Sequence, residues 1–212
     1  MALRRHWRPI VAIQVLALVI AIAYHQRVDV RNAAHGLELV KRAGGIVFAF
    51  VAGAFAGAVI PEFAKLVTGH LRQFDRKWVG DTLFNGFVYG LVGVEVDVFY
   101  HVQSRLFGDG SDVATLAIKT FVDMAIFSTI LSIPSAVLLY EGRKLGVRGL
   151  IKTWLRKGGY RELILPKLVM CWVFWIPVLF CVYAMPSDLQ LCLALLAEAA
   201  WSILFVFVAT EV

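Results

Sequence analysis

Six long apolar stretches constrain what this chain can fold into more than any other feature. They cover residues 9–24, 44–65, 84–106, 114–140, 164–185 and 189–209 of the 212. A helix crosses the ~30 Å hydrocarbon core of a bilayer with ~20 predominantly apolar residues, and several of the stretches reach that length. They lack the polar–apolar alternation of a membrane β-barrel. The sequence therefore predicts an all-α, polytopic helical membrane bundle of about six transmembrane helices.

Composition leaves little of the chain for a soluble domain. Hydrophobic residues make up 60% of the sequence and the mean hydropathy is +0.76, as expected for a helical membrane protein. We expect one compact bundle with an added N-terminal part. In this division residues 1–43 form a membrane anchor and a loop, and residues 44–212 form the helical bundle.

Lysine and arginine are distributed unevenly between the two ends of the expected spans. Fifteen fall in residues 4–8, 65–77 and 143–167, whereas five fall in residues 27–42 and at position 105. Because basic loops stay on the cytoplasmic or matrix side, we predict that both termini lie on that side. The membranes that fit are the mitochondrial inner membrane and the bacterial cytoplasmic membrane. The expected partners of the basic surface are anionic lipid headgroups, at about 1 kcal/mol per nearby cation, and not nucleic acid.

Small residues recur at helical spacing in the second and third stretches. Such small-xxx-small ridges let two helix backbones approach closely in lipid, so we expect these two helices to cross in contact. The pattern indicates packing and not chemistry. The residues expected at the crossing are Gly45, Ala49, Gly53, Gly57, Gly86 and Gly90.

An amphipathic helix is predicted between the fourth and fifth stretches. Its apolar residues follow the i, i+3, i+4, i+7 spacing of one helix face, and its cations occupy another face at i+4 spacing. We expect this helix to lie in the membrane interface, with its Trp at headgroup level and its cations toward phosphates. The residues expected to contact lipid headgroups are Arg148, Lys152, Trp154 and Arg156.

Ionisable side chains inside apolar stretches are the first candidates for function, because such groups are costly in a membrane. Asp97 and His101 lie four residues apart on one helix face, and Lys119 and Asp123 do the same on the next span. Glu95 lies about 200° around the helix from Asp97. Two interpretations stay open. One is a polar path for protons, ions or small solutes between the third and fourth helices; the other is a salt-bridge network in which Lys119 pairs with Asp97 or Glu95. The candidates are Glu95, Asp97, His101, Lys119, Asp123 and, in the last stretch, Glu198.

Sequence motifs of catalysis are absent from the chain. It has no phosphate-binding loop, no G-x-S-x-G and no H-E-x-x-H. Cys171, Cys181 and Cys192 fall in apolar stretches without metal-ligand spacing, so we expect free thiols that act as small hydrophobic residues. We predict that the protein is not an enzyme and holds no metal and no cofactor.

Tryptophan, proline and glycine markers recur from Gly44 to the C-terminus. In the clearest part, Trp201 follows Pro186 by fifteen residues. With these markers, about four-fifths of the chain resembles the family of the peroxisomal membrane protein of twenty-two kilodaltons and the Mpv-seventeen protein. The markers that carry the resemblance are Phe99, Tyr100, Asp123, Glu141, Gly142, Trp172, Trp175, Pro177, Pro186 and Trp201.

The resemblance implies a multi-pass protein of a peroxisomal, mitochondrial or bacterial membrane with a proposed small-solute pore activity. The chain departs from the family's pattern by placing apolar or weakly polar residues where the pattern has polar ones. A water-filled path needs polar side chains, whereas a helical scaffold tolerates their loss when its packing residues remain. The departing positions are Met124, Cys171, Leu179 and Leu195.

These observations favour a non-catalytic accessory or structural subunit of a larger membrane protein complex. Its expected partners are the lipid bilayer and other membrane subunits. The alternative is a small-solute or proton-conducting pore of the kind that the resemblance implies. Its path would be built around Asp97, His101, Lys119 and Asp123.

Overall fold

The computed structural model describes residues 2–69, 74–155, 160–161 and 164–210. These residues form helices and turns without a strand, so the predicted all-α fold is confirmed. Two segments, η1 and η2, are wound more widely as π-helix. The elements are α1 (Ala2–Gln26), α2 (Val28–Ala54), η1 (Phe55–Val59), α3 (Ile60–Val67), α4 (Arg76–Phe107), α5 (Val113–Val122), η2 (Asp123–Ser132), α6 (Ile133–Leu155), α8 (Leu165–Tyr183) and α9 (Ser187–Thr210).

Several helices have the length and composition of membrane spans. Among the described residues, Val28–Val67, Arg76–Phe107 and Val113–Trp154 are long and apolar enough to cross a membrane, and Ile10–Gln26 and Lys167–Tyr183 are shorter apolar helices. Large apolar side chains cover the outer faces of the bundle. Such a continuous apolar surface suits lipid and not water. The chain is therefore a membrane protein, while the number of its spans stays a prediction.

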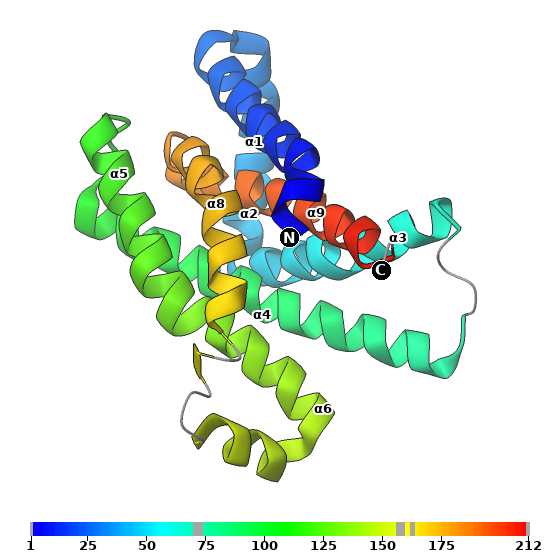
Figure 1. Cartoon of the computed structure of the whole chain (residues 1–212). Helices are drawn as coiled ribbons and strands as arrows, with labels where there is room; N and C mark the ends of the chain where they lie inside the picture. Colours follow the sequence, from blue (N-terminus) through cyan, green and yellow to red (C-terminus); the bar gives the residue numbers. More distant parts are fainter. Residues whose placement is uncertain (1, 70–73, 156–159, 162–163, 211–212) are drawn as a thin grey trace.

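Helix α2 and η1 lie against α4, which returns in the opposite direction, whereas α3 packs against α9 (Figure 1). Asp75 caps the start of α4 by accepting a hydrogen bond from the Trp78 amide at 2.7 Å. The helix ends at Gly108, whose φ of 75° is a backbone conformation that favours glycine. These two signals fix the length of α4, which supplies one wall of the candidate site.

A second capping residue, Asp112, begins α5. Its carboxylate accepts hydrogen bonds from the hydroxyl of Thr115 at 2.7 Å and from the Thr115 amide at 3.1 Å. The hydrogen bond from the Thr115 hydroxyl is the main reason why the pKa of Asp112 lies below its ordinary value. Asp112 therefore fixes where α5 begins.

Helix α2 bends sharply at Gly45. This residue has φ 49° and ψ −131°, a conformation that glycine adopts at little cost. A Cβ at Gly45 would meet nothing within 4 Å, so its predicted place in the helix crossing is wrong. Residues 28–44, which we expected to include a loop, are helical. The bend thus carries the end of this helical segment, with Lys41, into the bundle.

The largest packed core lies between α1, α8 and α9. Phe174, Val178 and Val182 on α8 are fully buried there. The Gln14 side chain of α1 donates a hydrogen bond to the Val173 carbonyl at 3.0 Å, which ties α1 to α8. We call the end at which α8 turns into α9 (residues 184–187) the hairpin end. The end at which α3 stops and α4 begins (residues 65–78) is the basic end.

Candidate functional site

The crossing of α2 and α4 brings glycine against backbone. Gly53 lies against the Tyr89 carbonyl and the Cα atom of Gly93, and Gly93 lies against the Ala49 carbonyl. A Cβ at Gly53 would stand 2.6 Å from the Tyr89 oxygen, a distance that real side chains do not adopt. The two backbones are therefore as close as only glycine permits.

The remaining small residues of the crossing face larger neighbours. Gly90 lies under the ring of Phe50, and Gly57 lies under the ring of Tyr89. Gly86 meets two alanine side chains of the facing segment at 3.8 and 3.9 Å. Because both Gly57 and the backbone at Gly53 confine it, Tyr89 is held in one position in the wall of the site.

A cluster of charged side chains joins α2, α4 and α9 near the hairpin end. The Lys41 ammonium lies 3.1 Å from Asp97, 3.8 Å from Asp188 and 3.3 Å from Nε2 of His101. Arg42 lies 2.6 Å from Asp188. We call these five residues the Lys41 cluster. Within it each carboxylate has a cation within 4 Å, which is the arrangement of an interhelical salt-bridge network.

The cation of this network is not the one that the sequence indicated. We expected Lys119 to pair with Asp97 or Glu95, whereas Asp97 pairs with Lys41. Glu95, on a different face of α4, accepts a hydrogen bond from Ser135 of α6 at 3.1 Å. The prediction was wrong because Lys41 was assigned to a loop, and the helical end of α2 places it between the spans.

Lys119 and Asp123 enter a different set of contacts. Lys119 is fully buried, and its ammonium lies 3.4 Å from Asp109 and 5.7 Å from the centre of the Tyr183 ring. The Tyr183 hydroxyl donates to Asp123 at 2.6 Å and accepts from Nε2 of Gln103 at 2.5 Å. We call Gln103, Tyr183 and Asp123 the tyrosine relay. It links α4, α8 and η2 deep in the bundle.

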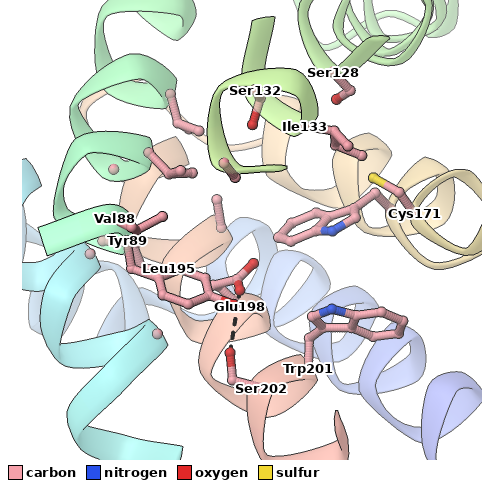
Figure 2. A pocket seen from close by; sticks show the side chains of 18 of the residues that line it. Val88, Tyr89, Ser128, Ser132, Ile133, Cys171, Leu195, Glu198, Trp201 and Ser202 are labelled. Carbon is pink, nitrogen blue, oxygen red and sulfur yellow. Dashed lines mark hydrogen bonds between the residues drawn. The ribbon is translucent and has the colours of Figure 1, made fainter. Parts of the chain in front are cut away.

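A chamber of about 880 Å³ lies between α4, η2, α6, α8 and α9, next to η1 and α3. Most of its wall is apolar. Figure 2 shows Glu198 and Ser202 of α9 facing Tyr89 of α4, with Ser128 and Cys171 on other sides of the same space. Residues between positions 53 and 202 therefore surround one space.

Four carboxylates stand in the described wall of this chamber, those of Glu62, Asp123, Glu141 and Glu198. The Ser202 hydroxyl donates to Glu198 at 3.3 Å. Among the described lining residues, the cations are Lys65 and Lys167. Lys65 is held at 2.5 Å by Glu62. The chamber thus carries more acid than base.

At the basic end the chamber meets a second, more polar hollow of about 720 Å³. In this hollow Arg143 lies 2.6 Å from Asp81, and the Tyr140 hydroxyl donates to Asn85 at 3.0 Å. A polar mouth therefore leads from the basic end into an apolar interior. The residues that line both spaces are Glu62, Lys65, Asn85 and Tyr140.

The chamber collects only some of the residues that the sequence indicated for a polar path. Asp123 is in its described lining, and Glu198 joins it from α9. Asp97 and His101 belong to the Lys41 cluster instead. Lys119 has its own acidic partner in Asp109. The ionisable groups of the spans are therefore divided between a paired cluster and an acidic chamber.

The predicted interfacial helix is the end of α6, set apart by a break at Gly146 with φ 70°. Arg148 and Lys152 are exposed, as a contact with headgroups requires. Trp154 is half-buried, packed against a small core of Val137, Ile164 and Leu168. Arg156 lies outside the described residues. The structure thus gives the Trp a packing role and leaves the cations on the surface.

The markers of the family resemblance occupy varied places. Trp175 and Trp201 line the chamber, and Trp201 packs against Phe174 with ring centres 4.4 Å apart. Trp172 is 38% exposed. Pro177 lies inside α8, and Pro186 precedes α9. The positions that depart from the resembled pattern share one location, because all of them line the chamber: Met124, Cys171, Leu179 and Leu195.

The sequence reasoning missed three important side chains. Lys41 was counted as a loop residue, and Gln103 and Tyr183 were not singled out at all. A buried Gln or Tyr in an apolar span needs a partner, so their polarity was the available signal. Among the described residues, no group of three His, Cys, Asp or Glu side chains could hold a metal ion.

Comparison of the chain with protein-family models, with curated proteins and with solved structures found no match. The family resemblance therefore stays a prediction. Arguments about function start from the chamber and from the charges around it.

Proposed function

We propose that this chain is a multi-pass membrane protein whose bundle admits a small solute, in the manner of a pore or carrier. This is the alternative that the sequence left second to a structural subunit. The observation that carries it is the chamber of about 880 Å³, which has four carboxylates in its described wall, among them Asp123 and Glu198. Ligand sites in proteins typically measure 300–1,000 Å³ and combine an apolar wall with a few polar groups.

The arrangement of charge supports entry from the basic end. The polar mouth lies where α3 stops, α4 starts and Arg143 follows the fourth span. In our topology, with six spans and both termini on the matrix or cytoplasmic side, this mouth faces the matrix or cytoplasm. At the other extreme Asp123 is 3% exposed, engaged in the tyrosine relay. The chamber thus has a polar entrance and a closed inner wall.

Four positions carry apolar or weakly polar residues where the resembled family has polar ones. A chamber with a changed wall explains them better than a chamber that has been filled. A scaffold that had lost its path would fill the space with larger side chains, because protein interiors are close-packed. Here Met124, Cys171, Leu179 and Leu195 make the wall apolar and leave the space open. Their position favours a solute with an apolar body and disfavours a continuous file of water.

Solute entry into proteoliposomes tests this proposal. Stopped-flow light scattering would follow the entry of a neutral solute, glycerol, and of charged solutes, choline and acetate. The matched variants are Leu195→Trp, which projects a large ring into the chamber, and Leu196→Trp, whose position is 50% exposed on the outer face. We expect protein-dependent entry of at least one solute, reduced severalfold by Leu195→Trp and unchanged by Leu196→Trp.

Entry that is absent for all solutes, or equal in both variants, would overturn the proposal and return the subunit hypothesis to first place. That hypothesis has its own measurement. After mild extraction, a native gel with mass spectrometry would show stoichiometric migration with other membrane subunits.

A further inference from the structure

We infer that the chamber selects organic cations with an apolar body, and that Glu198 is the residue that binds their charge. The inference rests on the proposed function and names the class of its solute. It is argued from the charge balance of the chamber, the aromatic side chains around it and its size.

Glu198 has no ion pair with a base among the residues that the structure describes. Its hydrogen-bond donor there is the Ser202 hydroxyl at 3.3 Å, and Tyr89 lies near the same carboxylate. A carboxylate in an apolar, membrane-embedded wall is stabilised in its charged form only by a nearby positive charge. Hydroxyl donors alone supply part of that stabilisation. An incoming cation would supply the rest.

Two nearby lysines have acidic partners of their own. Lys119 lies 3.4 Å from Asp109, and Lys65 is held at 2.5 Å by Glu62 at the mouth. The other cation of the described lining, Lys167, is exposed. Asp123 has the Tyr183 and Ser128 hydroxyls as donors, at 2.6 and 3.2 Å. Asp123 therefore has two hydrogen-bond donors and Glu62 has a lysine, while Glu141 adjoins Tyr140 at the mouth. Away from the mouth, Glu198 is the stronger attraction for a cation because it has a single hydroxyl donor.

Aromatic rings make up the other half of the site. Rings attract cations through their negative faces, by about 0.5–2 kcal/mol, and more strongly where water is excluded. Tyr89 lies beside Glu198 (Figure 2). A carboxylate among aromatic rings is the combination that recognises ammonium groups without requiring a hydrogen bond from them. The aromatic residues that line the chamber are Tyr89, Tyr100, Phe127, Tyr140, Trp175 and Trp201.

The size and the mostly apolar wall disfavour the smallest cations as ligands. Much of the surface that a hydrated metal ion would meet, such as Met124, Leu179 and Leu195, offers no oxygen ligand to replace its water. An organic cation loses less hydration and gains contact with these side chains. The chamber volume of about 880 Å³ accommodates such a molecule with a ring or several alkyl groups.

Equilibrium binding to the purified full chain in lipid nanodiscs tests the inference. The probes are benzyltrimethylammonium and phenylmethanesulfonate, which share a benzyl group and differ in the sign of their charge. We expect isothermal titration calorimetry to give a Kd for the cation at least about tenfold below that for the anion, since tenfold corresponds to about 1.4 kcal/mol. This comparison needs no variant and so does not depend on the folding of one.

Variants then locate the charge that the cation meets. Glu198→Gln should raise the Kd of benzyltrimethylammonium about tenfold and leave phenylmethanesulfonate no weaker. Glu38→Gln is the matched control, because Glu38 lies near the hairpin end, where it pairs with Arg42, and not in the described chamber lining. It should leave both affinities unchanged.

Equal or tighter binding of the sulfonate would overturn the inference and indicate an anionic ligand such as a lipid headgroup. Unchanged cation affinity in a monodisperse Glu198→Gln protein would also overturn it. Either result leaves the proposed function standing if Leu195→Trp still blocks solute entry. Failure of both assays would reject the proposed function as well.

Discussion

The Lys41 cluster and the chamber are two ways of placing charge inside the same bundle. In the cluster, Lys41 and Asp97 are almost completely buried, and their charged atoms are 3.1 Å apart. In the chamber, Glu198 has a hydroxyl donor but no ion pair among the described residues. The first arrangement is complete within the protein. We propose that an incoming solute completes the second.

This difference indicates which intramembrane charges are structural. A buried pair fixes how two helices meet, and removing one partner leaves a charge without compensation. A lone acid facing an open space does not hold helices together, so it is retained for another reason. Stability measurements should therefore separate the two regions, with large losses at the cluster and small ones at Glu198.

The largest effect is expected for Lys41→Met. Asp97 would lose its closest cation while remaining buried, and breaking a buried pair in this way costs about 3–5 kcal/mol. The free energy of unfolding should be measured by denaturing titration in bicelles. The double variant Lys41→Met with Asp97→Leu should recover much of the loss, because no uncompensated charge remains.

Arg42→Met is the matched control for that variant. Arg42 also pairs with Asp188, but its side chain is 59% exposed, so water can replace the pair. We expect no measurable change in the free energy of unfolding. A loss as large as that of Lys41→Met would contradict the distinction between buried and exposed members of the cluster.

Gly53→Leu should have the next largest effect. The new side chain would collide with the Tyr89 carbonyl and with Gly93, both backbone groups that cannot move aside separately. Overpacking of this kind costs about 1–3 kcal/mol. Gly36→Ala, in the same helix with nothing within 4 Å of its new Cβ, should be neutral or slightly stabilising. Equal stability of the two variants would refute the close crossing of α2 and α4.

Tyr183→Phe should weaken the tyrosine relay. It removes the donor to Asp123 and the acceptor for Gln103, and both of those groups are buried. An unsatisfied buried group costs about 1–3 kcal/mol. Cys181→Ser, two residues earlier on α8, controls for a small polar change in the same helix. Thermal unfolding in detergent should show a clear decrease for Tyr183→Phe, and its absence would mean that the relay is not a structural unit.

The helices could be predicted from sequence because their signals are local. Long apolar stretches and the small-residue spacing in residues 49–57 each act within one helix or one contact. The bend at Gly45 could not be predicted in this way. A glycine in a small-residue stripe serves packing or bending equally well, and tertiary contacts decide between them. Misassigning residues 28–43 then hid Lys41.

The site depends on contacts between distant parts of the chain, and this is why the sequence indicated it only in part. Asp123 and Glu198 were visible as charges in apolar spans. Their separation from Asp97 was not, because it depends on which helices are neighbours. The sequence also interpreted Leu195 as a lost polar position, whereas the structure places it in the wall of an open space.

Glu198→Gln provides the smallest effect and the sharpest contrast. The side chain keeps its shape and its hydrogen-bond acceptor for Ser202, and it loses a charge that has no ion pair among the described residues. We therefore expect the free energy of unfolding to stay within about 0.5 kcal/mol of the original, or to rise. Asp97→Asn, the same chemical change in the Lys41 cluster, should be destabilising because it leaves buried Lys41 with one fewer partner.

Denaturing titrations of both variants under the same conditions compare the two regions directly. A loss at Glu198 that equals the loss at Asp97 would mean that Glu198 has a structural partner, and the chamber would then have no free charge to offer a solute.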